Sequence, residues 1–159
     1  MSNFLLFNGE LKRDGEPLLP VTNRGFCYGD GFFESMRVSN GKLPFVKGHW
    51  QRLIRVCKFL RLQIPELLTE ERFNQFALAL VEKNGFVNAR IRFQGYRVGE
   101  GRYAPENNVL GWSMVCQELE TSALQLNKKG LHLDVCTTHS INPAPQSSFK
   151  CSNSLPYVL

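Results

Sequence analysis

The chain has 159 residues, of which 43% are hydrophobic and 21% are charged, and its formal net charge is +5 at pH 7. This length and apolar content predict one globular domain, or one and a half small ones, with a sizeable buried core. The lysines and arginines are scattered rather than clustered, so the basicity leaves only a weak hypothesis of nucleic-acid binding. It suits ligands that carry phosphate or carboxylate groups.

The sequence predicts neither a membrane span nor a secretion signal. No apolar run approaches the roughly 18 residues that a span needs, and Met1–Phe7 lacks the basic region of a signal peptide. The five cysteines are widely spaced without a Cys-x-x-Cys pair, which argues for reduced thiols and against a zinc site. We therefore expect a cytoplasmic protein with no membrane partner, no nucleic-acid partner and no metal.

The first elements in the chain are predicted to be strands around a glycine-rich loop. Phe4–Phe7 is a predicted strand, and Asn8-Gly9 predicts a tight turn into a second strand. Three glycines within residues 25–31 predict a loop that needs positive φ angles or close backbone approach. The aromatic and apolar run Phe32–Val38 then predicts a half-buried strand, and Leu43–Phe45, which contains a proline, predicts an edge strand.

Two amphipathic helices are predicted next. In Lys47–Leu62 an apolar stripe recurs at helical spacing, with most basic residues outside it. Thr69 is the predicted N-cap of a second helix, which has acidic residues in its first turn and ends at Asn84-Gly85. Strands are predicted at 89–97 and 109–117, and strands and helices together favour an α+β layer structure.

The last forty residues are predicted to lie outside this first domain. Glu118–Lys129 is polar and is typical of a connection between domains, Leu131–Cys136 predicts a strand, and residues 142–148 form a loop with two prolines. We therefore predict an N-terminal α+β domain over residues 1–120, a linker over 121–130 and the start of a second domain over 131–159.

Three motifs in this chain resemble the class IV aminotransferase family. In chain order they are Arg24-Gly25-x-x-Tyr28-Gly29-Asp30-Gly31-x-Phe33-Glu34-x-x-Arg37-Val38, His49-x-x-Arg52-Leu53 and Lys150-x-x-Asn153-x-Leu155. The family consists of pyridoxal-phosphate enzymes and includes branched-chain and D-amino-acid aminotransferases and aminodeoxychorismate lyase. The resemblance covers the whole chain, whereas the chain covers only about the first half of the family.

The resemblance implies a fold and a cofactor site. It implies a two-layer N-terminal domain, the beginning of a barrel-like cofactor-binding domain, and a homodimer. Lys150 would hold pyridoxal 5′-phosphate as a Schiff base and, once freed, act as general base. Arg52 would contact the cofactor phosphate, a task for which the planar guanidinium is suited, and Tyr28 would support the site by hydrogen bonding. His49 is expected to be a structural histidine.

Two arginines remain open as ligands of the substrate carboxylate. Arg97 resembles the carboxylate-binding arginine of D-amino-acid aminotransferases, whereas Arg102, in Gly99-x-Gly101-Arg102-Tyr103, is similar to the loop of the lyase branch. Either arginine could instead be a surface charge. Phe33 is expected to line the pocket for the substrate side chain.

We therefore predict amino-group transfer between an amino acid and a 2-oxo acid, with pyridoxal 5′-phosphate as cofactor. The alternatives are aminodeoxychorismate lyase, which eliminates pyruvate, and a non-catalytic fragment or interaction module. Glu34 after Phe33 favours the aminotransferase branch, and the Arg102 loop favours the lyase. Because the family places a carboxylate for the pyridine nitrogen well beyond the cofactor lysine, we expect this chain to be a fragment that is inactive alone.

Overall fold

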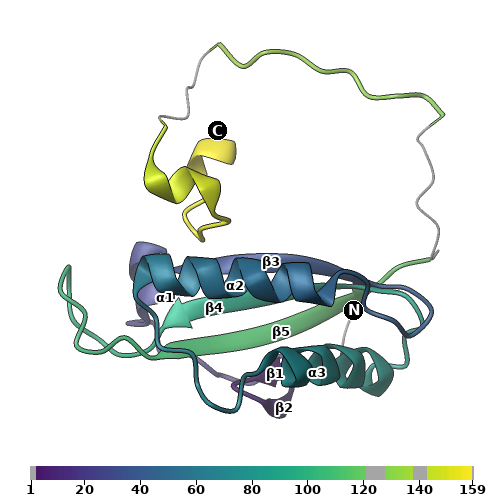
Figure 1. The fold of residues 1–159 in the computed structure, drawn as a ribbon, viewed down its shortest axis with the longest axis horizontal. Coiled ribbons are helices and arrows are strands. Elements are labelled where there is room, and N and C mark those ends of the chain that lie inside the picture. The colour runs from purple at the N-terminus through teal and green to yellow at the C-terminus, as the bar shows by residue number, and fades with distance from the viewer. Residues whose placement is uncertain (1–2, 121–127, 138–142, 159) are drawn as a thin grey trace.

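An antiparallel five-stranded sheet forms the centre of the protein. The computed structural model describes residues 3–120, 128–137 and 143–158. The strand order is β2-β1-β5-β4-β3, and the strands are β1 (Phe4–Phe7), β2 (Glu10–Arg13), β3 (Gly31–Val38), β4 (Ala89–Arg97) and β5 (Leu110–Glu118). Helices α2 (Val46–Leu60) and α3 (Glu70–Lys83) lie over the sheet (Figure 1). The predicted α+β class is confirmed.

The core lies between the sheet and the two helices. In β4, Ala89, Ile91 and Phe93 are buried whereas Arg90 and Arg92 are exposed, because successive side chains of a strand point to opposite faces. Ring contacts with centroids 5.6 or 5.7 Å apart connect the helices to the sheet through Trp50, Phe73, Phe93 and Trp112. The packed aromatic rings hold the helices and the sheet rigidly together, and β3 is the edge strand of this sheet.

Both predicted long helices are confirmed. The Thr69 hydroxyl accepts a hydrogen bond of 3.2 Å from the backbone N–H of Arg72 and so caps α3, as predicted. The strand predicted at Leu43–Phe45 is wrong. Pro44 has no N–H to donate to a strand ladder, and Phe45 takes a left-handed conformation, with φ of 59°, immediately before α2. In the described part of the chain, no helix is both long and apolar enough to span a lipid bilayer.

The glycine-rich stretch contains a helix that the sequence did not predict. Helix α1 (Arg24–Tyr28) begins after Asn23, whose side chain accepts a hydrogen bond from the backbone N–H of Gly25, and ends at Gly29, where φ is 64°. A glycine inside so short a helix lowers its intrinsic propensity, so the prediction of a loop was wrong here. The two caps, rather than propensity, determine this single turn.

The strand predicted at Leu131–Cys136 is also wrong. Residues 131–137 have no regular secondary structure, and Leu131, Leu133 and Val135 are strongly exposed. Figure 1 shows this stretch passing far from the sheet, so no described strand lies beside it to accept and donate the hydrogen bonds of a ladder. The predicted linker falls largely on residues 121–127, which lie outside the described residues.

The chain returns to the sheet next to Lys150, between two short 3₁₀ helices, η1 (Pro145–Ser148) and η2 (Leu155–Tyr157). The backbone N–H of Phe33 donates to the Lys150 carbonyl at 2.8 Å, and the N–H of Ser152 donates to the Gly31 carbonyl at 2.9 Å. The Phe149 ring packs on Phe59 of α2, with centroids 4.8 Å apart. Residues 149–152 therefore dock on the outer edge of β3.

Gly31 provides a test of how closely β3 packs against its neighbours. A Cβ at position 31 would overlap the Gly95 carbonyl oxygen and lie 3.2 Å from the Ser152 hydroxyl. Gly31→Ala is expected to lower the free energy of unfolding by about 1–3 kcal/mol, because the added methyl group has no space. Urea denaturation measures this change.

The matched control is Gly48→Ala, inside α2, where nothing lies within 4 Å of the added methyl group. This substitution is expected to stabilise the protein by about 0.5–1 kcal/mol through helix propensity. Equal stability of Gly31→Ala and the wild type would contradict the close packing of β3 against its neighbours.

Candidate active site

A cavity of about 280 Å³ opens where the 149–152 segment meets β3 and α2. Three predicted site residues, Phe33, Arg52 and Lys150, line it together. The complete lining consists of Phe32, Phe33, Glu34, Arg52, Arg55, Val56, Ser148, Phe149 and Lys150. We refer to this space as the lysine cavity.

Arg52 is held at the lysine cavity by a buried carboxylate. The Glu34 side chain is only 5% exposed, and both its oxygens accept hydrogen bonds from the Arg52 guanidinium, one of them from Nε at 3.1 Å. His49 Nδ1 lies 3.0 Å from Glu34 Oε1. His49 and Arg52 are three positions apart on α2 and so share one face of the helix. Because the Arg52 side chain remains 47% exposed, it can also bind a ligand in the cavity.

Glu34 remains ionised at neutral pH. Burial would raise the pKa of its carboxyl group, but the hydrogen bonds from His49 and Arg52 outweigh burial and lower the pKa to about 2. The cavity lining also contains Arg55 and Lys150, and Glu34 is its one acidic residue. Three cationic side chains thus face one carboxylate, which favours an anionic ligand.

The Lys150 side chain lies beside the aromatic ring of Phe33. Its Nζ lies 5.7 Å from the centroid of the Phe33 ring, and the Arg92 guanidinium carbon lies 4.1 Å from the same ring. Cations favour the face of an aromatic ring. Lys150 itself is exposed, and among the described residues no carboxylate forms an ion pair with it. Its amine is thus accessible to a ligand.

The other three predicted site residues line a second pocket, of about 450 Å³. Tyr28, Arg97 and Arg102 lie there, and the complete lining consists of Arg24, Tyr28, Asp30, Arg97, Arg102, Tyr103 and Pro105. We refer to it as the arginine pocket. The Tyr28 ring lies 6.1 Å from the Tyr103 ring, between centroids, and Tyr28 does not line the lysine cavity. The structure thus divides the predicted site residues into two groups.

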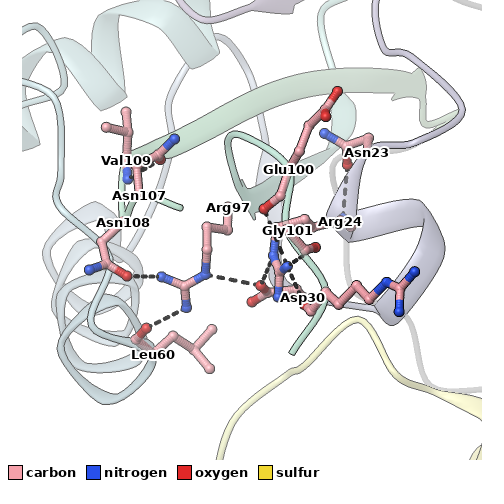
Figure 2. A network of polar contacts seen from close by, with 12 residues as sticks. Asn23, Arg24, Asp30, Leu60, Arg97, Glu100, Gly101, Asn107, Asn108 and Val109 are labelled. Atoms are coloured by element: carbon pink, nitrogen blue, oxygen red, sulfur yellow. Dashed lines mark hydrogen bonds and ion pairs between the residues drawn. The ribbon is translucent and has the colours of Figure 1, made fainter. Parts of the chain in front are cut away.

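The two arginines that could bind the substrate carboxylate, Arg97 and Arg102, differ sharply in their surroundings. Arg97 is 7% exposed, and its three guanidinium nitrogens donate to the Asp30 carboxylate at 2.9 Å, to the Asn108 side chain and to the Leu60 carbonyl at 2.7 Å (Figure 2). Arg102 is exposed, and its side chain forms no hydrogen bond or ion pair with any residue that the structure describes. Arg97 therefore joins parts of the fold, whereas Arg102 is available to a ligand.

Sequence reasoning missed the acidic partners of these arginines. The motifs indicate Glu34 only as a residue that favours the aminotransferase branch, and Asp30 only as part of the glycine-rich motif. The alternation of β3 contained a signal, because Glu34 falls on the same face as the buried Phe32 and Met36. A carboxylate at such a position needs a cationic partner.

Comparison with known proteins identifies the family. Residues 31–159 match the family described as amino-transferase class IV, and the chain belongs to this family, which confirms the resemblance seen in the motifs. It is 30% identical over 93 residues to D-alanine aminotransferases of Staphylococcus epidermidis and Staphylococcus aureus, a match that covers 58% of this chain and 32% of theirs.

Solved structures have the same fold. The branched-chain aminotransferase of Thermoproteus uzoniensis with norvaline superposes with a TM-score of 0.80 at 21% identity, over 99% of this chain and 54% of that one. The branched-chain amino acid aminotransferase from Escherichia coli gives a TM-score of 0.66 at 22% identity, over 75% of this chain and 42% of that one. The chain thus spans about a third of the length of its curated relatives and about half of its structural neighbours.

The lowered pKa of Glu34 predicts a pH-dependent contribution to stability. Because the pKa is lower in the folded state than the ordinary value of 4.5, the carboxylate stabilises the fold above that value, and this stabilisation is lost as the pH falls toward 2. Glu34→Gln is expected to lower the free energy of unfolding by about 2 kcal/mol at pH 7. The difference from the wild type should shrink below pH 4.5, as followed by urea denaturation.

Glu10→Gln is the control, because Glu10 lies on β2 and its ion pair with Lys12 is at the protein surface. It should leave stability nearly unchanged across this pH range. A destabilisation by Glu34→Gln that stayed constant from pH 7 to pH 2.5 would mean that ionised Glu34 does not stabilise the fold.

Proposed function

We propose that this protein transfers an amino group between an amino acid and a 2-oxo acid, with pyridoxal 5′-phosphate bound to Lys150. The observation that carries the proposal is the meeting of Lys150, Arg52 and Phe33 in one cavity, although Lys150 lies far from the other two in sequence. Membership of the class IV aminotransferase family supports it, as do the D-alanine aminotransferases among the relatives.

The lining of the lysine cavity fits this cofactor. Arg52 and Arg55 offer guanidinium groups for a phosphate, and Arg52 is already oriented by Glu34. Phe33 offers a flat apolar surface for a ring, and Lys150 offers a primary amine for an aldehyde. When bound, pyridoxal phosphate supplies the electron sink for the bond changes at the substrate Cα.

Lys150 has two tasks in this proposal. Its amine would hold the cofactor through the aldehyde group. When free, the same amine would act as general base and take the proton from the substrate Cα. The hydrogen bond from Phe33 N–H to the Lys150 carbonyl fixes the backbone, so only the flexible side chain has to move between the two positions.

We assign the substrate carboxylate to Arg102 rather than to Arg97. The three nitrogens of Arg97 already donate within the fold, and redirecting them would leave Asp30 without one of its two cations. Arg102 and Tyr28 line the same pocket with more exposed side chains. Phe33 stays the proposed contact for the substrate side chain, and a supporting role of Tyr28 toward the cofactor stays a prediction.

The homodimer is also a proposal. Phe26 in α1 is 80% exposed, and Val21 before α1 is 79% exposed. Exposed apolar side chains close together in sequence suit a surface that a second copy covers. A sedimentation measurement of the mass in solution tests this assignment.

The lyase remains a second candidate because of the glycine-containing loop that carries Arg102. Assays with defined substrates separate the two activities. Formation of glutamate from an amino acid and 2-oxoglutarate supports the aminotransferase, whereas release of pyruvate without any amino acceptor supports the lyase.

Substitution of Arg52 and of Arg102 should affect cofactor binding and substrate binding separately. In full-length protein, Arg52→Ala is expected to weaken retention of pyridoxal phosphate about ten- to a hundredfold, because a charge-assisted phosphate contact contributes roughly 1.5–3 kcal/mol. Arg102→Ala is expected to raise the KM for the amino acid and to leave cofactor retention unchanged. Equilibrium dialysis and initial rates measure the two effects.

Arg13→Ala, at the exposed end of β2, is the control for the loss of a positive charge and should change neither quantity. Equal loss of cofactor from the Arg52 and Arg102 variants would contradict the proposal that the lysine cavity binds the cofactor and the arginine pocket binds the substrate.

A further inference from the structure

Arg24 is a buried arginine that the proposed reaction does not use. It lies in α1 and is 5% exposed. One terminal nitrogen donates to the backbone carbonyls of Gly101 and Arg102, each at 2.5 Å, and approaches that of Glu100 at 3.4 Å. Figure 2 shows the guanidinium between α1 and this loop. One side chain thus contacts three consecutive residues of the loop that carries Arg102.

Asp30 fixes the guanidinium of Arg24 in this position. Its Oδ2 accepts hydrogen bonds from Arg24 Nε at 2.8 Å and from Arg97 Nε at 2.9 Å. Arg97 in turn donates to the Leu60 carbonyl at the end of α2. Arg24 is therefore attached, through Asp30 and Arg97, to β3, β4 and α2. The Arg24 guanidinium is therefore positioned by the sheet and α2 and not by the loop.

In the loop between β4 and β5, Arg24 supplies the hydrogen bonds to the middle part, where the Tyr103 ring also contacts Tyr28. The two ends of the loop are held by backbone hydrogen bonds, such as that from Val98 N–H to the Val109 carbonyl at 2.9 Å. Within the described part of the chain, the hydrogen bonds that reach residues 100–105 all come from Arg24. A cationic donor to a carbonyl forms a stronger hydrogen bond than a neutral one.

We propose that Arg24 is a positioning residue that holds the carbonyls of residues 100–102 and so orients Arg102 toward the substrate. The substrate part of this inference rests on the proposed function. A lysine could keep the ion pair with Asp30, but its single nitrogen cannot reach the carboxylate and the loop carbonyls with the geometry of the guanidinium fork. Both Arg24→Ala and Arg24→Lys should therefore release the loop.

Limited trypsin digestion tests the loop contact directly, because the Arg102 carbonyl belongs to the peptide bond that trypsin cleaves, Arg102–Tyr103. Proteolysis requires local opening of the chain, so Arg24→Ala is expected to speed this cleavage at least about tenfold, and Arg24→Lys at least about fivefold. Cleavage after Lys129, in an exposed stretch, serves as the internal reference. Arg13→Ala, which also removes one arginine, should leave the ratio of the two rates unchanged.

Arg24→Lys keeps the test decisive if Arg24→Ala does not fold, because it retains the charge beside Asp30. A wild-type ratio of cleavage rates in folded Arg24→Lys protein would overturn the proposal.

The second measurement is a double-mutant cycle on the full-length enzyme. Arg24→Lys should raise the KM for the amino acid about tenfold at unchanged kcat and unchanged retention of pyridoxal phosphate. In an Arg102→Ala background it should have no further effect, because it acts through Arg102. If Arg24→Lys raised the KM by the same factor in the wild type and in the Arg102→Ala variant, Arg24 would not act through Arg102. Faster cleavage with unchanged KM in Arg24→Lys would confirm the loop contact and refute the positioning of Arg102 by Arg24, whereas an unchanged KM in Arg102→Ala would refute the substrate role of Arg102 itself.

Discussion

Two backbone hydrogen bonds, from Phe33 to Lys150 and from Ser152 to Gly31, join β3 to residues 150–152, which lie far from it in sequence. They form because β3 is an edge strand, whose outer N–H and C=O groups need partners. Residues 131–137 have no regular secondary structure. With the pairing, Lys150 lies in a cavity whose opposite wall is α2, with Arg52. The proposed chemistry depends on this contact.

Two carboxylates organise the arginines around β3. Glu34 lies between His49 and Arg52 at the lysine cavity, and Asp30 lies between Arg24 and Arg97 at the arginine pocket. Removing one partner of such a pair is costly, because the remaining buried ion has lost its hydration. The carboxylates therefore also fix the orientation of their arginines. The exposed side of Arg52 and the loop that carries Arg102 are thereby held in defined positions before any ligand arrives.

Local patterns in the sequence predicted most of the fold, and the family resemblance suggested the candidate site residues, but neither showed how these residues group. Periodicity located β4 and both long helices, since each buries one face. The same alternation places Arg97 on the face of Phe93, and so indicated an arginine with partners inside the fold. No local pattern shows that residues 149–152 pair with β3, or that residues 131–136 find no strand beside them. Such pairing depends on contacts between distant parts of the chain.

The proposed function depends above all on the lysine to which pyridoxal phosphate attaches. Full-length protein would be incubated with the cofactor, reduced with borohydride, digested and mapped by mass spectrometry. We expect the label on Lys150, within the peptide that contains Phe149–Leu155, and no label there in Lys150→Arg protein. A label on Lys47, Lys128 or Lys129, with Lys150 unmodified, would contradict this assignment.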